Sequence, residues 1–206
     1  MPSIDQWNAI WNGLGATSAD ARLFHELSHR YAESHRYYHT LQHLDECFAW
    51  MPAVMPLAEH PYEIELALWF HDAIYDVKRQ DNEEKSAEWA RSAAVAAGLS
   101  TDVGERIYEL VMVTRHSGVP TAIDARLLVD IDLSILGAKA ERFDEYERQV
   151  REEYGWVPMM LFRRKRRQIL EEFIGRPRIF STGYFFERLE LSARSNLGRS
   201  IAKLGG

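Results

Sequence analysis

Apolar residues recur at helical spacing along almost the whole chain, and this periodicity constrains the fold more than any other feature. Ile4, Trp7, Trp11 and Leu14 would share one face of a helix that Ser3 can cap. Comparable patterns occupy residues 18–31, 39–51, 61–75, 81–98, 100–114, 124–137 and 143–154, a segment opened by Pro158, and residues 189–201. Ser18 and Ser100 can cap the helices that they begin, and Gly98 can end the helix before Ser100. No stretch alternates as a strand would. The sequence therefore predicts an all-α, multi-helix bundle.

Composition narrows the class of protein. The 206 residues are enough for one domain with a substantial core, so we expect a single domain over 1–206. A net charge of −6 argues against a general nucleic-acid binder or a membrane-surface protein. The single cysteine, Cys47, excludes a disulfide framework and a thiolate zinc site, and is expected to be a small core residue. No apolar run reaches the roughly 20 residues of a membrane helix, and no signal peptide is evident, so we expect a cytoplasmic protein.

Five of the eight histidines fall within residues 24–44, where two pairs have metal-site spacing. His25, Glu26 and His29 match the zinc-protease pattern H-E-x-x-H. Ala32 stands where the extended pattern needs glycine for a left-handed turn, and both histidines point away from Leu27, toward the polar face. We interpret this pair as two solvent-facing histidines.

The second pair, His39 and His43, is expected on one side of the third helix, beside its apolar stripe. The fourth predicted helix, "IELALWFHDAIY", is apolar nearly all round, yet carries His71 and Asp72 in its middle. A buried carboxylate is costly unless it is paired or bound to a metal. A histidine–aspartate hydrogen bond would be sufficient, but metal ligation accounts better for the combination.

The helix predicted over residues 124–137 also carries carboxylates within an apolar stretch. "LLVDIDLSIL" places Asp130 and Asp132 among apolar residues. At ~100° per residue the two carboxylates lie about 200° apart, so only one of them can face a common site. Polar ligand types thus follow one another along the chain in the order His, His-Asp, Asp.

This order resembles the signature of the HD-domain metal-dependent phosphohydrolases, and the likeness covers roughly residues 20–140. "YYHTLQHLDEC" is similar to a segment of the cyclic-nucleotide phosphodiesterases, which share that core. The blocks "WFHDAIYD", "DNEEKSA", "DIDLSILG" and "ARSNL" resemble a bacterial subfamily of predicted HD-superfamily hydrolases. The remaining residues, about 141–206, would form a helical C-terminal extension.

The resemblance implies a metal site and a mechanism. The metal ligands would be His43, His71, Asp72 and Asp132, the last preferred over Asp130 because it lies in a "DLS" context. The metal would be a divalent transition ion (Mn, Fe, Zn or Ni), with Mg as an alternative. His39 would act as the general acid.

Other candidate residues follow from comparison with the superfamily. Tyr75 stands where related nucleotide hydrolases have a catalytic glutamate, whereas Asp76 matches the aspartate of a Glu-Asp pair. Glu83 is either catalytic or a first-turn helix residue. We consider Arg36 a phosphate clamp or a surface residue, and His116 a phosphate donor or a helix-end residue.

The resulting expectation is a phosphohydrolase that cleaves a phosphoester of a nucleotide or another small phosphorylated molecule by metal-activated water. The alternatives are an inactive HD-domain module that senses a nucleotide or metal, and an HD-type di-iron oxygenase, which would need more ligand histidines. Small phosphorylated molecules are the expected partners, with no membrane, no general nucleic-acid binding and a possible homodimer. The basic run 163–167 is expected to be a solvated face, paired with nearby acids such as Glu171.

Overall fold

The structure is a computed structural model that describes residues 3–116, 118 and 120–205. Within these residues helix is the only regular secondary structure, which confirms the all-α prediction. The chain forms two compact units, residues 1–129 and 130–206, and the boundary falls inside one helix. The organisation as a single domain stays a prediction. No helix among the described residues is both long and apolar enough to span a membrane.

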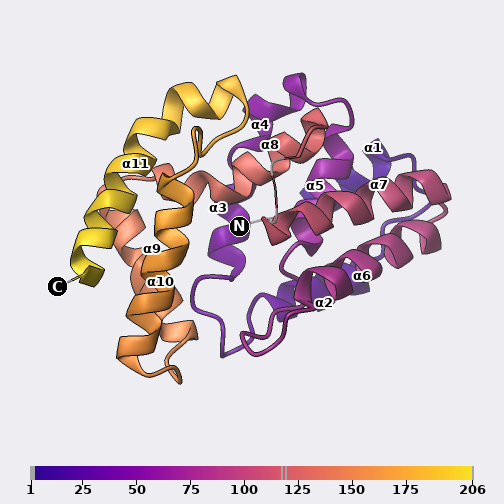
Figure 1. Ribbon diagram of the computed structural model, residues 1–206. Coiled ribbons are helices and arrows are strands. Elements are labelled where there is room, and N and C mark those ends of the chain that lie inside the picture. Colours follow the sequence, from indigo (N-terminus) through magenta and orange to yellow (C-terminus); the bar gives the residue numbers. More distant parts are fainter. Residues whose placement is uncertain (1–2, 117, 119, 206) are drawn as a thin grey trace. The chain divides into compact units, whose positions relative to one another are not determined.

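The first unit is built from helices (Figure 1). They are α1 (Ile4–Gly13), α2 (Ala21–Arg30), α3 (Leu41–Phe48), α4 (Met51–Val54), η1 (Met55–Leu57), α5 (Pro61–Phe70), α6 (Asn82–Ala96), α7 (Thr101–Met112), η2 (Val113–Arg115) and the larger part of α8 (Ile123–Asp132). In the second unit α8 ends and is followed by η3 (Leu133–Gly137), α9 (Ala140–Glu153), α10 (Met159–Ile174) and α11 (Gly183–Gly205).

Helix α5 forms the centre of the first unit and packs against α1, α3, α6 and α7. Its residues from Ile64 to Phe70 are buried. The ring centroids of Trp7 and Trp69 lie 5.4 Å apart, edge to face, and Phe24 lies 5.5 Å from Trp69. This aromatic cluster fixes α5 from the side of α1 and α2.

Helices α6 and α7 lie side by side in opposite directions (Figure 1). The turn between them contains Gly98 with φ +88°, a conformation that glycine adopts without steric cost. Ser100 then caps α7 by accepting a hydrogen bond from the backbone N–H of Val103. Both features agree with the sequence-based prediction.

In the second unit, α10 packs against α11 and α11 packs against η3. The contact with η3 depends on Gly137, since a Cβ at this position would lie 2.6 Å from the Cβ of Leu189. Phe180, Phe185 and Leu197 of this unit are fully buried.

Three local predictions were wrong. The cap of α2 is Asp20, whose side chain accepts from the backbone N–H of Arg22, and Ser18 lies before it. The third predicted helix begins only at Leu41, so His39 precedes α3 instead of forming part of it. Helix α5 ends at Phe70, with His71 as its C-cap. His71 and Asp72 therefore lie at the end of a core helix and not in its middle.

Candidate metal centre

His43 enters the core from the first turn of α3. Thr40 caps this helix by accepting a hydrogen bond from the backbone N–H of Gln42, and His43 then faces inward with 2% of its surface exposed. The hydroxyl of Tyr38 lies 3.0 Å from its Nδ1 atom. Because Nδ1 is held in this way, the ring presents Nε2 to the interior.

His71 is oriented by the end of α5. Its Nδ1–H donates a hydrogen bond of 2.7 Å to the carbonyl of Leu68, one turn back along the helix. With a proton on Nδ1, Nε2 carries a lone pair in the neutral ring, whereas in the protonated ring Nε2 can donate to the Asp72 carboxylate 3.0 Å away. This arrangement is the usual one for metal-binding histidines, whose second nitrogen donates to a carbonyl or a carboxylate.

The two Nε2 atoms converge with the carboxylate of Asp72. Nε2 of His43 lies 3.1 Å from Nε2 of His71. An Asp72 Oδ atom lies 3.0 Å from the His71 nitrogen and 3.6 Å from that of His43. Metal–ligand bonds of about 2.1 Å at tetrahedral or octahedral angles put neighbouring ligand atoms about 3.0–3.4 Å apart. The spacing and chemistry of these three groups fit a transition-metal ion, and we call them the histidine–aspartate cluster.

The electrostatics of the cluster favour an ionised carboxylate. Burial acts to raise the pKa of Asp72, but the neighbouring His71 and His39 and a hydrogen bond from His71 outweigh it. The pKa of Asp72 is therefore held well below its usual range. An ionised carboxylate beside two imidazoles is an appropriate donor set for a divalent cation.

The side chain of Arg36 is fully buried and contacts the backbone of Asp72, a residue of the cluster. Its guanidinium donates to the carbonyls of Asp72 (2.6 Å), Ala73 (3.1 Å) and His39 (3.3 Å), and it pairs with Glu33 at 3.2 Å. These contacts tie the segment before α3 to the end of α5. The sequence-based prediction of a phosphate clamp stays a prediction.

His39 lies next to the cluster, although it is not on α3. Its ring stacks on Tyr75 with centroids 4.1 Å apart and lies 6.1 Å from the ring of His43. The side chain is half-buried. This position suits a group that exchanges protons between solvent and a ligand at the cluster.

The other candidate residues of the first unit take part in different contacts. Asp76 is exposed and accepts a hydrogen bond from the backbone N–H of Lys78. Glu83, in the first turn of α6, lies 3.7 Å from the guanidinium of Arg115. His116 follows η2 with φ 52°, in the left-handed region. Their predicted roles in catalysis and substrate binding stay predictions.

The two aspartates of α8 differ within the second unit. Asp130 is fully buried and accepts hydrogen bonds from the backbone N–H and hydroxyl groups of both Ser181 and Thr182, at 2.6–3.2 Å. It thereby holds the segment that leads into α11. Asp132 is the last residue of α8 and is partly exposed. Asp130 is thus saturated with structural hydrogen bonds, and the preference for Asp132 as a ligand stays a prediction.

Two other groups of side chains that could bind a metal have roles that need no metal. His25 and His29 are exposed on α2, which confirms our interpretation of the H-E-x-x-H match. Glu59, His60 and Asp124 lie close enough to share a cation. The Asp124 carboxylate, however, accepts hydrogen bonds from the backbone N–H groups of Glu59 and His60, and so caps the start of α5.

Tyr38, which contacts Nδ1 of His43, is the residue beside the cluster that sequence reasoning missed. The signal was present in "RYYHTLQH", but nothing in the sequence distinguishes Tyr37, which is 44% exposed, from Tyr38, which is 4% exposed. Cys47 is buried as expected, with its sulfur 3.8 Å from Nδ1 of His43.

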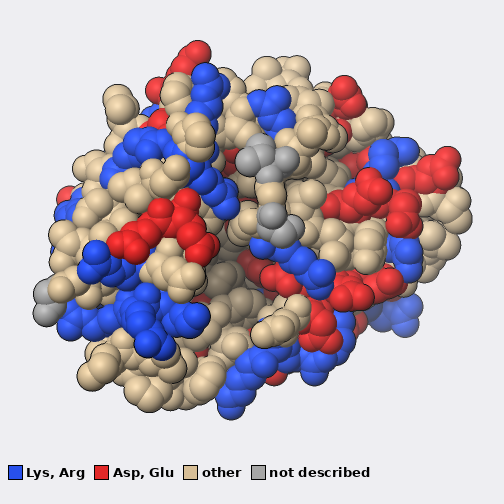
Figure 2. Space-filling model, viewed as in Figure 1, with Lys and Arg blue, Asp and Glu red and all other residues tan. Residues whose placement is uncertain are grey.

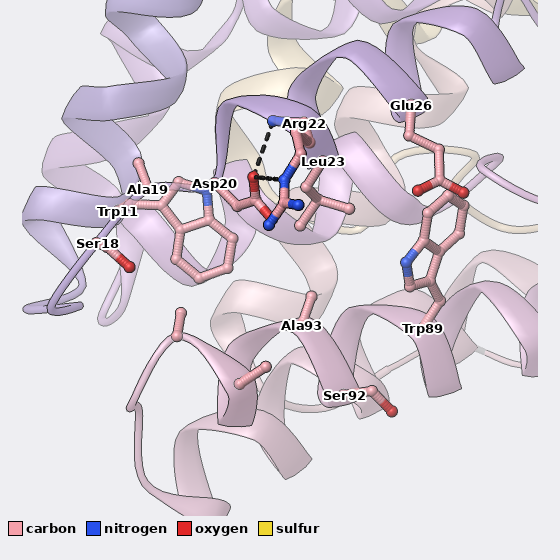
Figure 3. Close-up of a pocket in the computed structure, with 12 residues that line it drawn as sticks. Trp11, Ser18, Ala19, Asp20, Arg22, Leu23, Glu26, Trp89, Ser92 and Ala93 are labelled. Atoms are coloured by element: carbon pink, nitrogen blue, oxygen red, sulfur yellow. Dashed lines mark hydrogen bonds and ion pairs between the residues drawn. The ribbon is translucent and has the colours of Figure 1, made fainter.

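A pocket of about 780 Å³ opens elsewhere in the first unit, between the start of α2 and α6 (Figure 3). Trp11 and Trp89 border it, and Arg22 and Asp20 pair at its edge. Its lining includes no residue of the histidine–aspartate cluster. It is separate from the candidate metal centre.

The fold and this centre together define an all-α protein with two buried histidines that, with the carboxylate of Asp72, could hold a metal ion. Comparisons with protein-family models, with curated proteins and with solved structures found no match.

Proposed function

We propose that this chain is a metal-dependent phosphohydrolase acting on a phosphoester of a nucleotide or another small phosphorylated molecule. The observation that supports the proposal most strongly is the convergence of two imidazole Nε2 atoms and one carboxylate, 3.0–3.6 Å apart, in the core. Three groups that can each donate an electron pair to a metal face one point, and this arrangement suits a bound cation. We propose His43, His71 and Asp72 as metal ligands, joined by Asp132 as the resemblance implies.

A divalent ion of the Mn, Fe, Zn or Ni class would supply charge neutralisation for a phosphoryl group and a more acidic water. The residues of the chain supply the rest. Tyr38 and the carbonyl of Leu68 hold the imidazoles of His43 and His71 in place, so that both rings are oriented before a metal ion binds.

His39 is the proposed general acid. A water attacking phosphorus must be matched by a proton delivered to the leaving oxygen. His39 is beside the cluster, half-buried and stacked on Tyr75, and its backbone carbonyl is fixed by Arg36. Asp76 and Glu83 are retained as proposed catalytic groups, and Arg36 and His116 as proposed substrate contacts.

The experiment that tests the proposal begins with metal content. Protein purified without nickel affinity or chelator is analysed by elemental mass spectrometry, and phosphoesters are then screened with the metal found. We expect near-stoichiometric transition metal, and its loss in His43→Ala. His29→Ala is the matched control, because it removes one histidine of an i, i+4 pair that is exposed.

The outcomes separate the rival functions. Protein that carries no metal and takes up none of Mn, Fe, Zn or Ni would overturn the proposal. Metal-loaded protein that binds nucleotides without releasing product would instead establish a sensing module. Dioxygen consumption with iron would identify an oxygenase.

A further inference from the structure

The second unit carries a group of large apolar side chains at the surface. Trp156, Met159, Met160 and Leu161, just before and within the first turn of α10, are 58%, 55%, 85% and 40% exposed. Scattered single exposures are ordinary, but these four large apolar residues lie within six positions of one another. Exposed apolar patches mark surfaces that another body covers.

Two basic side chains share the face of α10 with this patch. At ~100° per residue, Met160, Leu161, Arg164 and Lys165 fall within an arc of about 140°. Arg164 and Lys165 are both exposed, and neither has an ion-pair partner in the described part of the chain. We call Met160, Leu161, Arg164 and Lys165, together with Trp156 and Met159 next to them in the chain, the α10 patch.

The rest of the basic run is engaged inside the unit. Arg163 donates to the backbone carbonyl of Lys203 at 2.9 Å. Arg166 is buried and pairs with Glu147, and Arg167 pairs with Glu171 at 2.8 Å, as the sequence led us to expect. Only Arg164 and Lys165 of this run therefore face solvent without a partner in the described part of the chain, so the run is not a uniformly solvated face.

Charge is unevenly distributed along the chain. Residues 130–206 contain 15 Lys and Arg against 12 Asp and Glu, a net charge of +3, whereas residues 1–129 contain 10 against 19, a net charge of −9. Figure 2 shows Lys and Arg side chains gathered over the first half of α10, next to uncharged surface at its start. The overall charge of −6 conceals this basic unit.

We propose that the α10 patch docks on an anionic lipid surface. Trp, Met and Leu side chains at the start of a helix can enter the boundary between headgroups and acyl chains. Arg and Lys stems lie along that boundary while their charged ends reach lipid phosphates. A nucleic acid would leave the apolar side chains unused, and a protein partner would have to desolvate both cations. The mixture of groups therefore favours lipid.

The experiment is vesicle co-sedimentation of the full chain, with vesicles of phosphatidylcholine alone and of phosphatidylcholine mixed with phosphatidylserine. We expect binding to the anionic vesicles only, weakening as salt is added. Met160→Ser should weaken it about tenfold or more, and Arg164→Glu with Lys165→Glu by at least about tenfold. Circular dichroism checks that each variant keeps its helices.

Matched controls separate the patch from general surface effects. Leu191→Ser removes an apolar side chain that is 86% exposed on α11, nearly the same as Met160. Lys139→Glu with Arg188→Glu changes two exposed cations of the same unit and gives the same net charge as the patch variant. Both controls should bind anionic vesicles like the wild type.

Three results would overturn the proposal. One is absence of binding to anionic vesicles, and another is equal weakening by the patch variants and their controls. The third is concentration-dependent self-association that Met160→Ser abolishes while vesicles bind nothing, since this would assign the patch to a second copy of the chain.

Discussion

Asp130 and Asp132 show how two identical residues, separated by one position, can take different tasks. Asp130 accepts hydrogen bonds from Ser181 and Thr182 and carries no capacity for another partner. Burial raises the pKa of this carboxyl, and those hydrogen bonds oppose the rise. We expect Asp130→Asn to lower the free energy of unfolding by about 2 kcal/mol, since an amide cannot accept all four bonds.

Asp132→Asn should affect metal affinity and leave stability nearly unchanged. It is partly exposed, so the free energy of unfolding should change little, whereas metal affinity should fall by at least about 100-fold if it is a ligand. Urea denaturation and metal titration of both variants provide the comparison. If Asp130→Asn were the variant that lost metal, the assignment of the ligand would be reversed.

Glu65 provides a pH-dependent prediction. This residue of α5 is 7% exposed. Burial raises its pKa to about 7 and outweighs a hydrogen bond with Gln6, which acts to lower the pKa. The folded state therefore holds the proton more tightly than the unfolded state, whose value is 4.5. The associated stability is fully present below pH 4.5 and is lost as the pH rises through about 7.

The size of this effect is up to about 3 kcal/mol. We expect the free energy of unfolding of Glu65→Gln to depend less on pH between 4.5 and about 7. Above about pH 7 the variant should therefore be more stable than the wild type. Urea denaturation across this pH range measures the effect, and Glu152→Gln, at an exposed position, is the control. A wild-type slope that persists in Glu65→Gln would show that another group is responsible.

At the scale of elements, the site depends on how the segment before α3 is joined to the end of α5. Arg36 makes that connection by donating to carbonyls on both sides while its guanidinium lies over the rings of Tyr31 and Tyr75. A lysine has a single ammonium group, which cannot span these carbonyls. We expect Arg36→Lys to lower the free energy of unfolding by about 3 kcal/mol.

The same substitution should weaken metal binding by misplacing His39 and the end of α5. Thermal denaturation and metal titration measure the two effects. Arg30→Lys is the control, because Arg30 pairs with Glu33 from a partly exposed position. Retention of wild-type stability in Arg36→Lys would contradict a role as a connector.

Helix starts were easier to predict than helix ends. Ser3 and Ser100 cap α1 and α7 through the side-chain hydrogen bonds that the sequence indicates. The end of α5 carries no proline or glycine, and the apolar pattern continues through Tyr75. It ends at Phe70, and the carbonyls of Leu68 and Trp69, which the next helical turn would use, accept instead from the His71 ring and from the hydroxyl of Tyr31, 38 positions before Trp69. Tertiary contacts of this kind leave no local signal.

At the scale of the molecule, the sequence predicted that His43 and His71 meet, but not how they are held. Residue types and their order pointed to His43 and His71, which lie 28 positions apart and approach to 3.1 Å. The division of the chain into a unit of −9 and a unit of +3 could also be counted, but only after the structure had placed the boundary. A charge summed over the whole chain hides such a division.

The metal proposal also has a consequence for the stability of the whole chain. The cluster joins α3 to the end of α5, which meet only when the chain is folded. An ion bound there stabilises the folded state by mass action, by about 2.7 kcal/mol when its free concentration is a hundred times the dissociation constant. We therefore expect the unfolding temperature to rise with metal concentration and to fall after chelation. His43→Ala should abolish the shift and His29→Ala should preserve it, whereas a shift that survives in His43→Ala would mean that the metal binds elsewhere.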